Sequence, residues 1–402
     1  MARERRTRIV AIAALGTIAS IAAIASGCGG KFTLPTEVHG ARVIPSDGSY
    51  QMIATWTGMD GIQDILLTQG TGSQLFLLFN TGGSGLGTRG HVALYSRTAK
   101  TGAPAPFGPD AFAPLSSLFN PVAICAGTAP ALSPPRRLYV LDQGDTLLAR
   151  SDPATGAHDP KSRIFDLSAY WRVREFHLLG GDTVSTFTDT SLAFVRGVAA
   201  DEQGLVYVAG IAIAFLPNPF DPRLAERVFR PVIYRYARGP RYPGVDPPDH
   251  NMPGAAWHRD TTWSVEGSPG IGTVGDVGQI DWASYAGGWI YSTDPTQGQL
   301  QQLSPLLSNT RGFIVNGSDD PPSFDNPLDV SVDLQGFVYV ADRGNHRAER
   351  YDASGAWVQR VDVELDAFQQ ALQNPVTLAA DDSLVFVGDP TLREVVRYQR
   401  RR

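Results

Sequence analysis

One segment recurs along this chain and constrains the fold more than any other feature. Its central portions align without gaps at residues 198–209, 330–341 and 378–388. Each copy reads as a strand, a tight polar turn, and a second strand rich in Val and aromatic residues. Self-similarity of this kind is typical of repeat architectures. The chain is therefore expected to consist of repeated antiparallel strand units.

The spacing of the copies indicates the size of one unit. The last two copies follow Asn326-Pro327 and Asn374-Pro375, which lie 48 residues apart. One four-stranded propeller blade takes about 40 to 50 residues. Weaker copies of the strand pair begin near Asp64, Asn120 and Ile280. With these the count is six, so we predict an all-β protein, a six-bladed β-propeller of four-stranded antiparallel blades.

The composition agrees with short strands joined by turns. The 402 residues include 42 Gly and 29 Pro, together about 18 % of the chain against a usual value of about 12 %. This excess argues against helical bundles and coiled coils. Apolar residues recur along almost the whole length, which excludes a disordered chain.

The copy that runs from Asn326 to about Val361 resembles the NHL repeat. Residues 336–347 read Gly-Phe-Val-Tyr-Val-Ala-Asp-Arg-Gly-Asn-His-Arg, which follows that family's pattern of glycine, apolar strand, Asp and Gly-Asn-His-Arg loop. The other copies keep the strand pair but lack the Gly-Asn-His-Arg element. The resemblance implies a six-bladed propeller whose strands radiate from a central channel.

The ends of the chain are expected to close the ring. The last copy ends at Tyr398 after three strands, which leaves one edge of its sheet unpaired. The alternating segment 50–56 precedes the first blade. We therefore predict that this segment supplies the missing outer strand.

The first 28 residues carry an export signal. Four arginines precede an uncharged run at 9–24, and the small residues 25–27 lead to Cys28. A basic region, an apolar region and small residues before a cleavage point are typical of a secretory signal peptide. The Cys at this point resembles the bacterial lipoprotein lipobox. The resemblance implies that Cys28 is acylated, for instance with palmitate, and that the peptide before it is removed.

An uncleaved membrane anchor is the alternative, because residues 9–27 come close to the roughly 20 residues that cross a bilayer. Either way the rest of the chain lies outside the cytoplasm. We expect a lipoprotein signal peptide at 1–27, a tether at 28–40 and the propeller at 41–402. The predicted location is the bacterial cell envelope, on the outer membrane if the organism has one, with the protein a monomer held by its lipid.

The charge argues against a nucleic-acid partner. The formal net charge is -6, and residues 1–27 contribute +3, so the remainder carries -9. Proteins that bind nucleic acid usually present a basic face to the phosphates. The second cysteine, Cys125, lies in an apolar stretch and is expected to be a buried small hydrophobe with no disulfide partner.

Enlarged loops indicate where a ligand binds. In a four-stranded blade the loops after the second and fourth strands emerge on one face, and the turns after the first and third emerge on the other. Segments 80–90 and 210–231 are expected to follow second strands, and 169–192 a fourth strand, so all three share a face. Segment 238–262 is expected to follow a third strand and to project from the opposite face.

Binding usually resides on loops that a rigid scaffold holds in place. The face with three enlarged loops is therefore the predicted ligand-binding face. Its expected contributors are Trp171, Arg172, Phe215, Phe220, Arg223, Arg343, Asn345 and His346.

Motifs for catalysis or metal binding are absent from the sequence. The seven histidines show no HxH or HExxH spacing, and the glycine run 82–87 lacks the residues of a nucleophile elbow or a phosphate loop. The sequence therefore favours a binding or scaffold module for a protein, peptide or glycan, without a cofactor, over an enzyme.

An enzyme is the alternative function. Six-bladed relatives that this fold resembles include lyases and lactonases with a divalent cation in the central channel. That resemblance implies a channel-bound Ca2+ near Asp64, Asp281 and Asp329, which are expected on first strands close to the axis.

Overall fold

In the computed structural model, the described residues lie between 48 and 401 and belong to one compact unit, Asp47–Arg402. The predicted signal peptide 1–27, Cys28 and the tether 28–40 lie outside the described residues. The segments inside 48–401 that also lie outside them are 70–72, 82–89, 100–117, 119, 129–135, 144–170, 179–182, 190, 218–224, 240–256, 268–275, 284–287, 309, 316–322 and 362–371.

The described strands form six antiparallel sheets, which we number as blades 1 to 6 in chain order. The strands of blades 1 to 3 are β2 (Ile62–Leu67), β3 (Leu75–Asn80), β4 (Gly90–Tyr95); β5 (Pro121–Thr128), β6 (Arg136–Asp142), β7 (Arg172–His177), β8 (Thr183–Phe187); and β9 (Leu192–Ala200), β10 (Val206–Pro217), β11 (Ala225–Arg238), β12 (Trp257–Glu266). Those of blades 4 to 6 are β13 (Ile280–Ala283), β14 (Trp289–Asp294), β15 (Gln299–Leu303), β16 (Arg311–Val315); β17 (Pro327–Val332), β18 (Val338–Asp342), β19 (Arg347–Tyr351), β20 (Trp357–Arg360); and β21 (Thr377–Ala380), β22 (Leu384–Asp389), β23 (Glu394–Arg400), β1 (Tyr50–Thr57).

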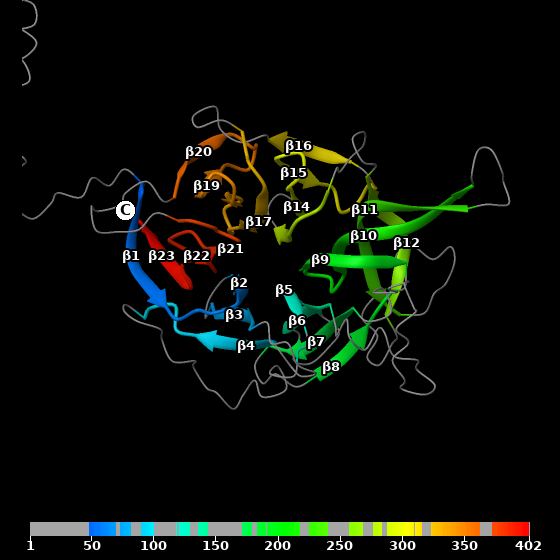
Figure 1. Ribbon diagram of the computed structural model, residues 1–402, viewed down its shortest axis with the longest axis horizontal. Coiled ribbons are helices and arrows are strands. Elements are labelled where there is room, and N and C mark those ends of the chain that lie inside the picture. Colours follow the sequence, from blue (N-terminus) through cyan, green and yellow to red (C-terminus); the bar gives the residue numbers. More distant parts are fainter. Residues whose placement is uncertain are drawn as a thin grey trace, which may run out of the picture. The chain divides into compact units, whose positions relative to one another are not determined.

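The six sheets close into a ring around a central channel (Figure 1). The first strand of each blade contacts the first strand of the next, in the order β2, β5, β9, β13, β17, β21, and β21 contacts β2 again. This circular order confirms the predicted six-bladed propeller. Among the described residues no helix is long and apolar enough to cross a membrane.

The ring closes where the sequence predicts. Strand β1 pairs antiparallel with β23 and forms the outer strand of blade 6, so that prediction is confirmed. The Tyr50 hydroxyl also lies 2.9 Å from the hydroxyl of Tyr339 in blade 5. Blade 1 has three described strands, and the segment where its fourth strand is expected lies outside the described residues. The chain after β4 lies outside the described residues until Leu118, which forms a single bridge to Gly90.

The hydrophobic core lies between neighbouring blades. Each second strand is sandwiched in its sheet, and β18 and β22 are buried at every residue. One core cluster joins Tyr139 of blade 2 to Val206 and Tyr236 of blade 3. Cys125 belongs to this cluster and is buried, which confirms its predicted burial.

An Asp at the end of the first strand explains why the sequence repeats. The Asp333 carboxylate accepts hydrogen bonds from the backbone N–H groups of Gln335 and Phe337, and from the Tyr339 hydroxyl. Asp201 accepts the same three bonds in blade 3, and Asp381 caps the matching turn in blade 6. The recurrent motif is therefore a capped turn between the first and second strands.

A second Asp ends the second strand in four blades, as Asp142, Asp294, Asp342 and Asp389, all fully buried. Each accepts a backbone N–H from the segment that enters its own blade, donated for example by Asn120 to Asp142 and by Asp325 to Asp342. These carboxylates therefore hold together one face of the ring. We call it the loop face: first strands begin there and second strands end there. The other face is the turn face.

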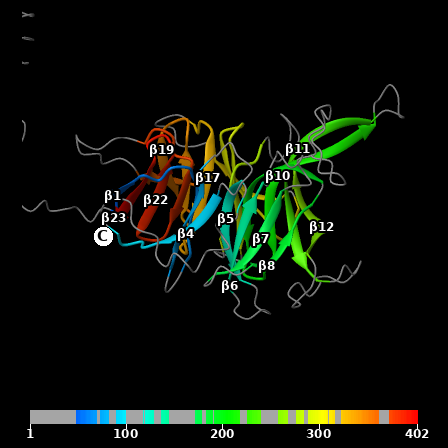
Figure 2. The same ribbon diagram turned by 60° about the horizontal axis from the view of Figure 1, so that its bottom comes forward.

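Blade 3 departs from this pattern and produces a projecting hairpin. Gly210 stands where four other blades have the second Asp, and β10 continues to Pro217. Strands β10 and β11 pair up to Pro217 and Ala225, whereas β9 pairs only to Ala212 and β12 only from Val232. Segments 213–217 and 225–231 thus form a two-stranded arm, which extends beyond the ring on the side away from β1 (Figures 1 and 2).

Two of the predicted loops are therefore strands. Segment 210–231 follows the second strand of its blade, as expected, but most of it is the β10–β11 arm. Segment 169–192 does not follow a fourth strand: it contains β7 and β8, the third and fourth strands of blade 2. Strands β7 and β8 are short and polar, and their apolar alternation is too weak to distinguish them from a loop in the sequence. Segment 238–262 begins where the third strand β11 ends, as predicted.

Candidate functional site at the mouth of the channel

The loop-face mouth of the channel holds a cavity of about 510 Å³. The starts of several first strands surround it, together with the loop after β14. Its aliphatic lining comes from Ile62, Val122, Leu328 and Val376, and its polar lining from Gln63, Gln279, Thr296, Asn326, Arg196 and Asp276. The mouth therefore offers amide and hydroxyl groups beside aliphatic side chains.

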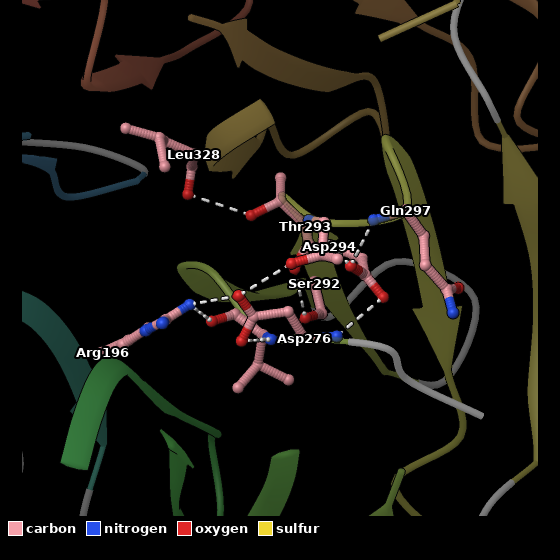
Figure 3. A network of polar contacts seen from close by, with 9 residues as sticks. Arg196, Asp276, Ser292, Thr293, Asp294, Gln297 and Leu328 are labelled. Carbon is pink, nitrogen blue, oxygen red and sulfur yellow. Dashed lines mark hydrogen bonds and ion pairs between the residues drawn. The ribbon is translucent and has the colours of Figure 1, made fainter. Parts of the chain in front are cut away.

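Arg196 and Asp276 form an ion pair at this mouth (Figure 3). The Arg196 guanidinium lies 2.6 Å from the Asp276 carboxylate and also donates to the Val277 carbonyl. Arg196 points here because it is the extra residue of a bulge in β9, opposite Ala209 and Gly210. The pair is half-exposed, so it neutralises the mouth more than it stabilises the fold.

The ion pair is anchored to blade 4. The Asp276 backbone N–H donates to buried Asp294, and the Thr296 hydroxyl donates to the Asp276 carboxylate. Asp294 also accepts the backbone N–H of Gln297, which fixes the loop after β14 (Figure 3). The polar groups of the mouth are thus held by hydrogen bonds to one another and to buried Asp294 before any ligand arrives.

Gln279 separates this mouth from the rest of the channel. Its side-chain amide donates to the Val122 carbonyl at 3.1 Å, and so reaches from blade 4 to blade 2. On the far side lies a second cavity of about 330 Å³, which Gln279 also lines. The channel is therefore divided into two compartments at this level.

Three carboxylic acids, Asp64, Asp281 and Asp329, line the second cavity. Each accepts the backbone N–H of the residue after it, and each also accepts one from the first strand of the following blade, donated by Ile124, Val332 and Leu378 respectively. All six carboxylate oxygens are engaged in this way. These carboxylates therefore link adjacent blades around the channel.

Burial changes the acidity of these groups. Desolvation raises the pKa of Asp64 to about 7 and the pKa of Asp281 to about 6. Burial, together with the neighbouring Asp64 carboxylate, raises the pKa of Asp329 well above its usual value. The Thr377 hydroxyl donates to Asp64 at 2.9 Å. The inner channel therefore gains negative charge as the pH rises towards neutrality.

The described residues do not fit a Ca2+ site. Calcium takes six to eight oxygen ligands at about 2.3 to 2.6 Å, whereas the oxygens of Asp64, Asp281 and Asp329 are used to join strands. Among the described residues, no three His, Cys, Asp or Glu side chains are grouped so that they would hold a metal ion. No chemistry that depends on a channel cation is derived from this arrangement.

The predicted residues of blade 2 lie at the loop face but support the blade. Trp171 is buried, and its indole N–H donates to the carbonyls of Asp189 and Leu192. Arg172 begins β7 and lies 3.6 Å from the Asp142 carboxylate. Neither residue lines the mouth.

The predicted residues of blade 5 lie together in the loop between β18 and β19. Asn345 donates to Asp342 and to the Ser323 carbonyl, and Arg343 donates to Asn374. His346 has a positive φ of 55° and contacts the Gln373 carbonyl. Arg343 and His346 thus contact the segment that enters blade 6, Asn345 contacts its own blade, and none of the three lines the mouth.

Of the three remaining predicted residues, only one falls in the described part of the arm. Phe215 is part of β10, and its side chain lies outside what the structure describes, as do Phe220 and Arg223.

Sequence reasoning missed Gln63, Gln279 and Thr296, which line the mouth. Asn326, which also lines it, was noted only as part of an Asn-Pro pair. The available signal was one of position and not of motif. Each first strand begins at the loop face, so the residues at the start of a first strand surround the channel. Asn326 has a positive φ of 55°, which fits its place in a tight connection.

Comparison with known protein families supports the repeat. Residues 324–347 match the family model of the NHL repeat. A comparison with curated proteins gave no significant match. Among solved structures, the chain is similar to a protein described as a candidate gluconolactonase, with 12 % identity, a TM-score of 0.47, and 89 % of this chain and 93 % of that chain covered.

It is also similar to the PQQ-bound form of an aldose sugar dehydrogenase from Streptomyces coelicolor, with 13 % identity and a TM-score of 0.45 over 88 % of this chain and 99 % of that chain. At this level the likeness says nothing about activity. The matched NHL segment covers the first two strands of blade 5, β17 and β18, and ends at the first residue of β19.

Proposed function

We propose that this protein is a tethered binding module that holds an uncharged polar ligand, such as a glycan, at the loop-face mouth of its channel. The observation that carries the proposal is the cavity of about 510 Å³ at that mouth. Sites for small ligands are typically about 300 to 1,000 Å³. The amides of Gln63, Gln279 and Asn326 offer both donors and acceptors, which match sugar hydroxyl groups.

The charge of the mouth supports an uncharged ligand. Arg196 and Asp276 are the charged residues of its lining, and they neutralise each other at 2.6 Å. A charged ligand would have to compete with this pair. A neutral polar ligand leaves it intact and still gains hydrogen bonds from the rim.

The tether is the second part of the proposal. Acylation of Cys28 would hold the protein at a membrane of the cell envelope, because each buried methylene of an acyl chain contributes about 0.8 kcal/mol. Strand β1 begins at the turn face, where Tyr50 pairs with Arg400. A tether joined at that end enters the ring away from the mouth, which supports an accessible loop face.

The tether is tested by metabolic labelling with radiolabelled palmitate. We expect label on the wild-type chain, no label on Cys28→Ala, and full label on Cys125→Ala, which removes the other cysteine. Label that survives in Cys28→Ala would refute the lipid anchor and leave the membrane-spanning alternative.

The binding site is tested on a glycan array. The ring closes within Asp47–Arg402, so this unit is used after its cooperative melting has been checked. We expect Asn326→Gly, which suits the positive φ, and Thr296→Val to weaken binding by about tenfold, the value of one or two hydrogen bonds. Gln335→Ala, an exposed residue of the turn face, is the matched control. If no glycan binds, or if the mouth variants bind like wild type, the proposed site is wrong.

A further inference from the structure

The base of the β10–β11 arm carries an exposed apolar surface. Phe194 and Phe229 have 44 % and 45 % of their surface exposed. Phe194 pairs with Ile211 across β9 and β10, and Phe229 pairs with Ile213 across β10 and β11. Since residues 211 and 213 point to the same side of a strand, the four side chains form one surface, which we call the arm patch.

The arm patch continues the mouth of the channel. Phe194 lies two residues from Arg196 on β9, a separation of roughly 7 Å along a strand, and Arg196 lines the mouth. Figure 3 shows Arg196 extending from β9 towards Asp276 and blade 4. On β10 the same face carries Tyr207 and Ala209, which pack between blades 3 and 4. The arm patch is therefore this inter-blade surface extended beyond the cover of blade 4.

The size of the arm patch limits what can occupy it. A Phe side chain buries about 150 to 250 Å² at most, so two half-exposed Phe rings and two partly buried Ile side chains offer roughly 200–300 Å². A stable protein interface needs about 800 Å² on each partner. An alkyl chain buries roughly 30 Å² per methylene, so a chain of about eight to ten carbons matches the arm patch.

We infer that the ligand is amphipathic: its uncharged polar head lies in the mouth and an alkyl chain lies along the arm patch, as in a glycolipid. This inference rests on the proposed function, because it takes the head group to the same mouth. It explains why blade 3 replaces the strand-ending Asp with Gly210 and lengthens its hairpin beside the mouth. The extended strands provide an apolar surface beyond the paired part of blade 3.

The inference is tested with alkyl glucosides of increasing chain length, used below their micelle concentrations. Binding of hexyl, octyl and decyl glucoside to the unit Asp47–Arg402 is measured by calorimetry. We expect affinity to rise by about tenfold or more from hexyl to decyl, because one fully buried methylene is worth about fourfold. In each of the variants Phe194→Ser and Phe229→Ser, the affinities for the three glucosides should differ from one another by no more than about twofold. Trp357→Ser, with 46 % exposure on β20, is the matched control and should behave like wild type.

Four other outcomes would overturn the inference. If glycans bind but chain length has no effect, the alkyl chain is wrong and the proposed function stands. If neither glycans nor glucosides bind, both are wrong. If sedimentation shows a dimer that Phe194→Ser and Phe229→Ser dissociate, a second copy covers the arm patch. If the unit binds phosphatidylethanolamine vesicles and these two variants abolish that binding, the arm patch contacts a membrane surface.

Discussion

Blades 3 and 5 carry the same capped turn but differ at two other positions of the repeat. Blade 5 has Asp329 on its first strand and Asp342 at the end of its second, and blade 3 has Gly197 and Gly210 in their places. Asp329 binds the next blade and Asp342 holds the loop face. Both blades bulge at the residue before the first of these positions, at Leu328 and Arg196, but only blade 3, which lacks the two carboxylates, extends into the arm. The turn cap is therefore sufficient for a blade, while the two acids decide how it ends.

The largest effect is expected where blade 5 loses its loop-face acid. Asp342→Ala removes one of the two carboxylates that pair with Arg347, which is fully buried 2.7 Å away, and it also removes the acceptor of the Asp325 N–H. Breaking a buried pair costs about 3–5 kcal/mol, so the free energy of unfolding in urea should fall by about that amount. Asp352→Ala, at a partly exposed turn of the same blade, should cost about 1 kcal/mol. Equal losses would mean that Asp342 has no special role.

The linking acids of the channel should make stability depend on pH. The pKa of Asp64 is raised to about 7 in the folded protein, above the value of about 3.9 in an unfolded chain. The folded state therefore binds more protons between these values, and the stability of the wild type falls as the pH rises from about 4 to 7. Between these pH values the free energy of unfolding of the wild type should fall by roughly 3–4 kcal/mol relative to that of Asp64→Asn.

Urea unfolding of both proteins at several pH values measures this difference. Blade 3 has Gly197 at the matching position and therefore no acid there. The dependence of stability on pH should come only from blades that link to the next blade through a carboxylate. A difference between the two proteins that does not change from pH 4 to 8 would show that Asp64 titrates normally.

Gly210 should be required for the course of blade 3. A Cβ at this position would lie 2.2 Å from the Phe194 carbonyl oxygen, and backbone cannot yield as a flexible side chain does. Gly210→Ala should therefore destabilise the ring by roughly 1–3 kcal/mol. Gly58→Ala is the comparison variant: nothing lies within 4 Å of a Cβ at this position, so the substitution tests the effect of a positive φ without a steric clash. If Gly210→Ala melts like wild type, the close approach of β9 does not fix this strand.

The smallest effect on stability is expected from removal of the arm. Residues 213–229 are replaced by Asn-Gly, which joins the paired residues Ala212 and Arg230 and favours a tight hairpin. Since the arm pairs with neither β9 nor β12, its removal should change the free energy of unfolding by no more than about 1 kcal/mol. The melting temperature should therefore shift by no more than roughly 2–4 °C. Loss of cooperative melting would show that the arm is part of the core.

Much of the ring was predictable because the capped turn is local. Asp333, the glycine at 336 and Tyr339 lie within seven positions, and Gly336 takes the positive φ of 85° that the turn requires. The pairing of β1 with β23 was predictable from an unpaired edge. The mouth was not, because Gln63, Gln279 and Asn326 lie in different blades and have no common spacing. The loop residues Trp171, Arg172 and Asn345 looked available in the sequence, but they bind their own blades.

By itself the sequence determined the strand pairs, their number and the closure of the ring, since each depends on contacts between residues close in the chain or on one free edge. Only the tertiary structure decided which side chains surround the channel, and that Asp64, Asp281 and Asp329 join blades instead of forming an ion cage. It also decided that segment 210–231 extends as an arm beside the mouth. These outcomes depend on how the blades are arranged around the axis, and that arrangement brings together residues whose separation in sequence carries no signal.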